Sequence, residues 1–453
     1  MTQPQQGGNR FSPVAKLETL GGFGLYLYFL SFQLNATVAY IGLSMLVLVF
    51  AFQATLWMPV LKHDRVTWVF LLIVAYILLY SIWSAQEFPE TKQAQRTASF
   101  LWLHWLMFIP VGWQLSRQHK QLNRLLAALA IGLMIRIVVN FNWAELGTLR
   151  TGFGMAETVF APIAGTMALG LLMLAPRTLN PSNTPRWVAW LNLTACGIGL
   201  VIFLEALVLS QTRGVWLAAA LVFPVALLVR YKSWLASHAK FSVKSLIALL
   251  VLGFVAILFV QKNYVTILNR VNSEQIRAEP EVVKKQIEGQ DIMLTTSTGY
   301  RKILWGIGWR KWQERRLLGW GPGSTENLII QESNPLLSQS ITLKDGSTET
   351  LHLYHLHSLY LELLVRFGVL GTGLLIALPL LLLSNVGKAY IEGMIPWDYT
   401  CFLFAGWALL AIMVASDFQL FKFAWRNYCV IWAALTYAVQ FPSRNLDTQQ
   451  TRL

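Results

Sequence analysis

Charged residues are scarce in this chain of 453 residues, because Asp, Glu, Lys and Arg together make up only 13% of it. Soluble globular domains carry roughly twice that share, so a soluble domain is excluded. Hydrophobic residues make up 55%. Apolar runs of about 16 to 24 residues recur along nearly the whole chain, a length that suits a helix crossing the roughly 30 Å hydrocarbon core of a bilayer. The composition predicts a polytopic membrane protein.

Cysteine is rarer still, and the three that occur all lie in apolar runs: Cys196, Cys401 and Cys429. An odd number of buried thiols supports neither a disulfide framework nor a zinc site, so we expect three packing residues. The chain has no internal repeat. We also expect no cleavable signal peptide, because Met1 to Ser12 is polar and no small-residue cleavage pattern follows.

Hydropathy predicts about twelve transmembrane helices and therefore an all-α integral membrane protein. The expected spans are residues 18–34, 37–58, 66–84, 98–114, 125–140, 158–175, 187–209, 215–230, 244–261, 358–383, 398–416 and 424–441. We expect residues 1–261 to hold the first nine helices and residues 358–441 the last three. A large helical loop domain over 262–357 separates them, and 442–453 forms a tail.

The net charge of +14 is explained by topology. With the N-terminus inside, the inside segments hold sixteen Lys and Arg, whereas the short outside loops hold six. Under the positive-inside rule this bias places both termini in the cytoplasm. A nucleic-acid partner is not expected, since no basic stretch interleaved with aromatics lies in a soluble domain.

The long outside loop has three recognisable parts. Residues 271–290 have the spacing of a charged helix, and Arg301 to Arg316 predicts a second helix with tryptophans at 305, 309 and 312 on one face. We expect this tryptophan face to rest on the membrane interface. The segment Leu317 to Ser324, LLGWGPGS, then requires a tight irregular turn.

Two charged residues lie near the outer ends of predicted spans. Charges inside a membrane are costly, so each is a candidate for function. Arg136 lies about one turn from the end of the fifth span, where it either binds an outer-leaflet ligand or extends toward headgroups. Glu205 occupies the matching position in the seventh span and either orients or neutralises an arginine such as Arg213 or Arg136.

Two further arginines lie in outside loops. Arg150 precedes TGFG at Thr151 to Gly154, which we expect to be a mobile segment, and it is either solvated or a ligand for substrate. Arg213 stands in QTRG, in a connection of only a few residues between two helices. A guanidinium held there suits a phosphate, because its planar donors grip phosphate oxygens bidentately, although interfacial arginines are common in membrane proteins.

Three of the seven histidines, His352, His355 and His357, crowd together before the tenth span. Their spacing matches no zinc pattern and no cysteine completes a ligand set, so we expect no metal site. An imidazole is also suited to act as a general base near pH 7. His357 is favoured for that role because it is expected to start a helix; the alternative is a histidine that only bonds backbone.

Three short motifs in order resemble the O-antigen ligase family, within the superfamily that also holds O-antigen polymerases and protein O-oligosaccharyltransferases. They are TRG at Thr212 to Gly214, Arg301 to Ser324 ending in GWGPG, and HSLYLELLVRFGVLG at His357 to Gly371. The family's usual His-Asn pair is here His357-Ser358, which puts any role of the amide in doubt. The resemblance implies that Arg213, Arg301 and His357 are needed for activity.

The resemblance further implies a glycosyl transfer that needs no metal or other cofactor. The donor is expected to be a polysaccharide linked to undecaprenyl diphosphate, the acceptor a sugar hydroxyl of lipid A-core, and the site the periplasmic face of a bacterial inner membrane. Membrane lipids are expected partners. From their positions in the chain, and not from the resemblance, Arg136, Arg150 and Glu205 are also expected to bind substrate.

Other functions remain open from sequence. A polymerase or a protein glycosyltransferase of the same superfamily is expected to share the motifs, since acceptor choice depends on loop shape. A secondary transporter also has about twelve helices, but transporters place their sites near the bilayer midplane, often in symmetric halves. Here the unusual residues gather near the outer face, around one loop.

Overall fold

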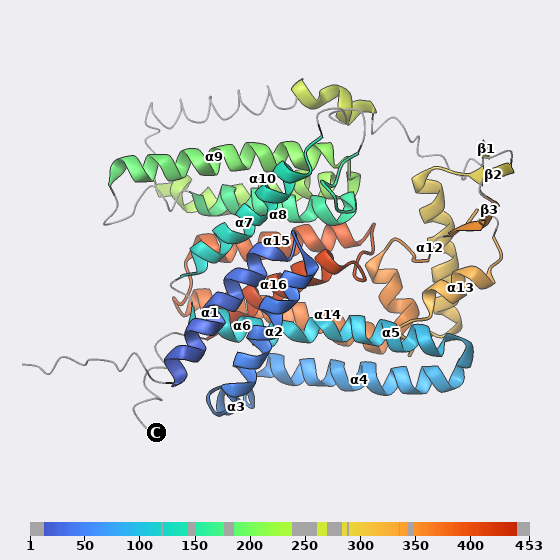
Figure 1. The fold of residues 1–453 in the computed structure, drawn as a ribbon, viewed down its shortest axis with the longest axis horizontal. Coiled ribbons are helices and arrows are strands. Elements are labelled where there is room, and N and C mark those ends of the chain that lie inside the picture. The colour runs from blue at the N-terminus through green and yellow to red at the C-terminus, as the bar shows by residue number, and fades with distance from the viewer. Residues whose placement is uncertain are drawn as a thin grey trace, which may run out of the picture.

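The structure, a computed structural model, describes residues 13–118, 121–142, 150–175, 185–237, 261–269, 283–287, 290–334, 336–342, 348–352 and 354–441. Helices dominate it (Figure 1). They are α1 (Pro13–Ser31), α2 (Ala36–Phe52), α3 (Ala54–Leu61), α4 (Arg65–Glu87), α5 (Lys92–Leu103), α6 (Phe108–Arg117), α7 (Leu122–Val139), α8 (Glu157–Leu174), α9 (Arg186–Leu209), α10 (Arg213–Ser237), α12 (Ser297–Glu314), α13 (Thr325–Gln331), α14 (Leu359–Ile391), α15 (Trp397–Val414) and α16 (Phe423–Ala438).

Within these ranges, seven helices are long and apolar enough to cross a membrane, or eight if the bent pair α2 and α3 forms one span. They support a multi-pass membrane protein. Every predicted span that falls in described residues coincides with helix, but the total of twelve is not confirmed, and most of the predicted span 244–261 lies outside the described residues.

Two of the predicted spans are not straight helices. The stretch 98–114 is interrupted by a 3-10 turn, His104–Met107, before α6 begins. Pro110 falls in the first turn of α6, where its missing N–H costs nothing, whereas inside a continuous helix it would break a hydrogen bond. The stretch 37–58 bends by 80° between α2 and α3. Buried Gln53 holds that bend, since its Oε1 accepts from Gln114 Nε2 at 2.7 Å.

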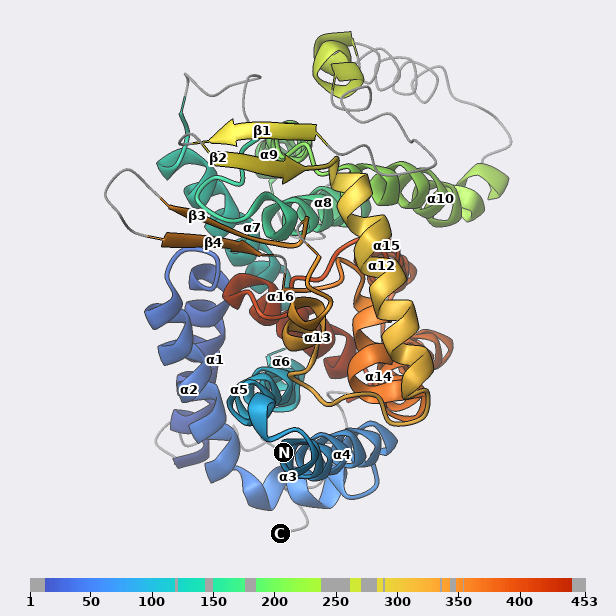
Figure 2. The ribbon, with the colours of Figure 1, turned by 90° about the vertical axis from the view of Figure 1, so that its right-hand side faces the viewer.

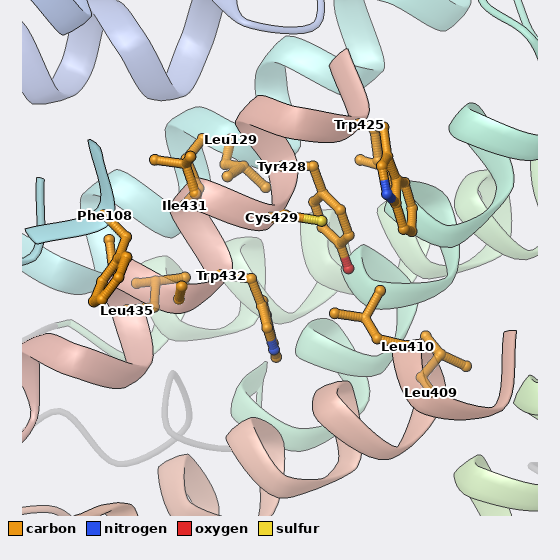
Figure 3. Close-up of a cluster of buried hydrophobic side chains, with 14 of the residues drawn as sticks. Phe108, Leu129, Leu409, Leu410, Trp425, Tyr428, Cys429, Ile431, Trp432 and Leu435 are labelled. Carbon is orange, nitrogen blue, oxygen red and sulfur yellow. The ribbon is translucent and has the colours of Figure 1, made fainter. Parts of the chain in front are cut away.

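The centre of the bundle is built around α16, which is buried on nearly all sides. Figure 3 shows Tyr428, Trp432 and Leu435 of α16 pointing into a cluster that also takes Leu409 and Leu410 from α15. Most residues of α16 are apolar, and a helix that is apolar on most of its sides belongs in such a core. Its C-terminal part packs on α6, and α15 packs on α8 and α10.

The loop between the predicted ninth and tenth spans contains strands as well as helices. β1 (Val283–Ile287) pairs antiparallel with β2 (Gln290–Leu294), and β3 (Ser338–Thr342) pairs with β4 (Thr348–His352). The expected helix over 271–290 is wrong for its described part, because β-branched Val283 and Ile287 flank a strand there. The second predicted helix is confirmed as α12, which runs across the long axes of α4 and α5 at one end of the bundle (Figures 1 and 2).

A small second core joins this loop to the bundle. It contains Leu304 and Ile307 from the buried face of α12, Leu328 and Ile329 from α13, and Leu356 and Val365 from the segment around the start of α14. The other face of α12 carries Trp305 and Trp309, which are 38% and 50% exposed. Trp312, the third tryptophan of the predicted face, packs against the second core instead. The exposure of the other two fits the expected contact with a membrane interface, which stays a prediction.

The GWGPG segment fits into a break in α14. Gly368, inside that helix, has a φ of 59° and a ψ of −168°, so the helical hydrogen bonds fail there. Segment 316–321 replaces them. Four backbone hydrogen bonds join the two segments: Trp320 N–H to Val365 O (2.9 Å), Gly321 N–H to Arg366 O (2.9 Å), Val369 N–H to Arg316 O (2.8 Å) and Leu370 N–H to Leu317 O (3.2 Å). Two of the three sequence motifs therefore satisfy each other's backbone groups.

Replacing Gly368 with Ala is expected to destabilise the protein by at least about 1–3 kcal/mol, because only glycine tolerates this backbone conformation. The new Cβ would also lie 2.2 Å from Leu317 O. Gly373 of the same helix is the control, since its added Cβ meets nothing within 4 Å, and Gly373→Ala should raise stability by about 0.5–1 kcal/mol. Thermal unfolding of the purified variants measures both. Equal melting temperatures for the two would contradict the interlock.

Candidate functional site

His357 lies just before α14, in a turn and not in the helix. Its φ is 51°, the left-handed region that non-glycine residues seldom adopt, and α14 begins two residues later at Leu359 after the N-cap Ser358. The expectation that this histidine starts the helix is therefore wrong by two residues. The ring faces the connection between α15 and α16, where its charged partner lies.

That partner is Asp417, which the sequence interpretation did not identify. His357 Nδ1 lies 3.5 Å from Asp417 Oδ1, within ion-pair distance although long for a hydrogen bond. Burial alone would raise the pKa of Asp417, but the nearby His357 and the hydrogen bonds from Gln419 and the Phe418 N–H outweigh it, so its pKa lies below the ordinary value. Asp417 is therefore a carboxylate at neutral pH. A carboxylate at Nδ1 fixes the tautomer that leaves Nε2 as the basic nitrogen.

His355 is the third member of this group. Its ring lies 4.1 Å from that of His357, and its Nδ1 accepts the His357 backbone N–H at 3.4 Å. Burial, together with the charge of His357, lowers the pKa of His355 to about 4, so it is neutral at pH 7. Within the described residues no group of three His, Cys, Asp or Glu has the arrangement of a metal site; the side chain of His352 is outside the description.

Arg213 is the first residue of α10, so it stands where the first backbone N–H groups of the helix have no partner within the helix. The adjacent Gly214 lies close to the loop before α16, because a Cβ there would lie 2.6 Å from Ser416 Oγ. Ser416 directly precedes Asp417. The TRG motif is therefore packed against the loop that carries the carboxylate.

Arg301 lies in the second turn of α12, and its Nη1 donates to Ser297 Oγ at 2.9 Å. Gly308 is seven residues further along, so it lies on the same face about two turns away. A Cβ on Gly308 would lie 2.7 Å from Leu356 Cδ1, which means that this face of α12 contacts the residue before His357. All three motifs thus meet around the His357 turn.

Arg150 and Thr151 are held by contacts with neighbouring segments. Arg150 Nε donates to Ser210 O at 3.3 Å, and its Nη2 lies 3.9 Å from Glu157 Oε2. The Thr151 N–H donates to Leu209 O at 3.2 Å. These bonds hold the loop against the connection between α9 and α10, close in sequence to Arg213. Its expected part in substrate binding stays a prediction, and its position supports it.

Arg136 is engaged by backbone carbonyls. Its Nε donates to Phe153 O at 2.9 Å, its Nη1 to Gln33 O at 2.5 Å and its Nη2 to Gly154 O. These contacts join α7 to the end of α1 and to the loop before α8. They account for a partly buried arginine without any ligand, so its role in substrate binding stays a prediction without support from these contacts.

Glu205 does not face either of the arginines proposed for it in the contacts described. Its Oε1 accepts from Lys262 Nζ at 2.8 Å, and Asn263 Nδ2 lies 3.4 Å from both carboxylate oxygens. The expected pairing with Arg213 or Arg136 is therefore corrected: Glu205 holds the helical segment 261–269 against α9. Hydropathy places Lys262 at the start of the long loop, so the sequence did not indicate that it lies in a helix next to Glu205.

A comparison with family models matches residues 198–376 to the O-antigen ligase family. The matched region begins in α9, contains all three motifs and ends in α14 beyond its break. It contains Arg213, Arg301 and His357 but not Asp417. Comparison with curated proteins gives no match.

Proposed function

We propose that this chain, whose residues 198–376 match the O-antigen ligase family, is a glycosyltransferase that moves O-antigen polysaccharide from undecaprenyl diphosphate to a sugar hydroxyl of lipid A-core. The pairing of His357 with Asp417, 3.5 Å apart at the meeting point of the three motifs, carries the proposal. An imidazole oriented by a buried carboxylate is the arrangement that a general base requires.

The proposed reaction is a single displacement. His357 Nε2 takes the proton of the acceptor hydroxyl while that oxygen bonds to the anomeric carbon of the donor sugar. The bond from this carbon to the phosphate oxygen breaks, and undecaprenyl diphosphate leaves with the electron pair. Asp417 stabilises the imidazolium that forms and keeps the ring in position, as the buried carboxylate does in other histidine-based sites.

The leaving diphosphate gains negative charge as its bond breaks, and Arg213 and Arg301 are proposed to bind it. The N-terminal position of Arg213 on α10 supports this role, because helix N-termini and guanidinium groups both favour phosphate. Fixed cations aimed at developing charge lower the barrier without reorganisation. No metal or other cofactor enters the proposed step. Arg150 is a further proposed contact for the donor. Substrate binding by Arg136 and Glu205 stays a prediction, which their contacts within the protein do not support.

The proposed outcome at the anomeric carbon is inversion. Retention requires a carboxylate that attacks this carbon as a nucleophile. Asp417 is buried and accepts from Phe418 N–H at 2.8 Å and Gln419 Nε2 at 3.1 Å. A carboxylate so occupied supports the histidine and not a covalent intermediate.

We place the reaction on the periplasmic face of the bacterial inner membrane, with both termini in the cytoplasm. The site then lies at the bilayer edge, where the lipid tails of donor and acceptor enter from the side between helices. Residues 262–357 form the periplasmic loop domain in this proposal, between the membrane parts 1–261 and 358–441, and 442–453 is the cytoplasmic tail. The exposed tryptophans of α12 contact membrane lipids.

Deleting the chromosomal gene and restoring the wild type tests the function. The deletion strain should carry bare lipid A-core and accumulate lipid-linked polymer, and the wild-type gene should restore long chains on the core, seen on a gel of the lipopolysaccharide. A deletion that leaves one repeat unit on the core indicates a polymerase. Loss of sugar from a protein indicates a protein glycosyltransferase, and loss of solute uptake with normal lipopolysaccharide indicates a transporter.

A further inference from the structure

Glu362 and Arg366 form a buried ion pair one turn apart in the first part of α14. Glu362 Oε2 lies 2.5 Å from Arg366 Nε, and the two side chains are 0% and 3% exposed. Taking two charges out of water costs several kcal/mol per ion, and a pair of apolar residues often serves stability as well. Stability alone therefore does not explain the pair, so its role must be inferred from its other contacts.

One end of the pair holds the His357 turn. Glu362 Oε1 accepts the backbone N–H of Leu356 at 2.7 Å, the residue directly before His357. Its Oε2 also accepts from Thr325 Oγ1 at 2.8 Å, at the start of α13. The left-handed conformation of His357 needs outside support, and the carboxylate of Glu362 supplies it from inside the protein.

The other end holds the segment of Asp417. The Arg366 guanidinium lies 5.5 Å from the ring centre of Phe418 and 5.1 Å from that of Phe421, and it also donates to Pro322 O in the GWGPG segment. Phe418 follows Asp417 directly and contacts the ring of His355 at 5.9 Å. One buried pair thus reaches both partners of the proposed base.

Resting on the proposed function, we propose that Glu362 and Arg366 are positioning residues, which together set the distance between His357 and Asp417. Neither reaches the substrate: Glu362 acts through the Leu356 N–H and Arg366 through the Phe418 ring. The pair therefore controls the rate of the chemical step and not the binding of the lipid-linked donor.

The experiment compares two uncharged double variants of the full-length enzyme. Glu362→Gln with Arg366→Met keeps an oxygen for the Leu356 N–H; Glu362→Leu with Arg366→Met removes it. Removing both charges together avoids an unpaired buried ion. Transfer from undecaprenyl-diphosphate-linked polysaccharide to lipid A-core is measured in vitro. The Leu variant should lose about 10²-fold in kcat, because a displacement near 1 Å has that effect, with an unchanged KM for the donor, and the Gln variant should recover much of the loss.

The control is a second pair of the same spacing on the same helix. Lys388 and Glu392 lie 3.7 Å apart and are 73% and 46% exposed, so Lys388→Met with Glu392→Leu should leave kcat unchanged. A double-mutant cycle with Asp417→Asn adds a readout that a general loosening of the structure would not change. In the Asp417→Asn background, removing Glu362 and Arg366 should lower kcat much less than in the wild type.

Three results overturn the proposal: equal kcat for the Gln and Leu variants, a loss that appears in KM alone, or losses that multiply fully with Asp417→Asn. If the Leu variant does not fold, Phe418→Leu keeps the ion pair, removes the Phe418 ring that Arg366 contacts, and must lower kcat. Failure of the proposed function is distinct, because the wild-type enzyme would then transfer no chain to the core.

Discussion

Replacing His357 with Asn is expected to reduce transfer of polysaccharide to lipid A-core by about 10²–10⁴-fold, the usual contribution of a general base. Asn is preferred to Ala as the test because it adopts a left-handed backbone readily, and His357 has a φ of 51°. The variant therefore loses the imidazole without adding strain. Lipopolysaccharide from the complemented deletion strain should stop at bare core, and the lipid-linked polymer should accumulate.

His63 provides the matched control for this variant. It is an exposed histidine in the turn between α3 and α4, remote in the fold from the His357 turn. His63→Asn should restore the full ladder of chains. Both variants should be present in the membrane at wild-type amounts, as judged by immunoblot. A full ladder from His357→Asn would show that the histidine is not the base.

Replacing Arg301 with Lys is expected to lower kcat by about 10²–10³-fold, the range seen when one group that stabilises transition-state charge is removed. Lys keeps the charge but lacks the planar fork that binds two phosphate oxygens at once. Arg213→Lys should behave in the same way, since both arginines are proposed to bind the same diphosphate. In vitro transfer with the purified acceptor measures kcat and the KM for the donor.

Arg310 of the same helix provides the control, which shows whether the effect is specific to the position of Arg301 or follows from losing any arginine of α12. It is exposed and pairs with Glu332 at 2.9 Å, on a different face of α12 from Arg301. Arg310→Ala should transfer chains at the wild-type rate. If Arg301→Lys matches wild type while Arg301→Ala is inactive, charge alone is sufficient and bidentate binding is wrong.

The helices could be predicted from sequence wherever length and hydropathy agree, as in α4, α9 and α14. Breaks inside helices could not, because they depend on distant partners: the bend at Gln53 needs Gln114, and the break at Gly368 needs segment 316–321. The hairpin of β1 and β2 was missed for a related reason. A charged strand with little alternation has the same composition as a charged helix.

The candidate site was predicted in part. The three family residues lie in motifs that meet around one turn, through the close approaches of Gly214 and Gly308. Asp417 is sixty positions from His357 and stands at the end of an apolar run, where an acidic residue is a common helix-end feature. The only feature of the sequence that could have indicated Asp417 as a partner of His357 is that both residues lie at the outer ends of predicted spans. Glu205 is the opposite case. The sequence indicated that it had a cationic partner but named Arg213 or Arg136, whereas the residue it contacts is Lys262.

The interlock of segment 316–321 with the break in α14 has a consequence for synthesis of the protein. The ribosome delivers the GWGPG segment before residues 365–370, which supply its four backbone partners. Until residues 365–370 are in place, those N–H and carbonyl groups have only water as a hydrogen-bond partner. The GWGPG segment therefore completes its backbone hydrogen bonds only after residues 365–370 have been made, so this part of the site is finished from its C-terminal side.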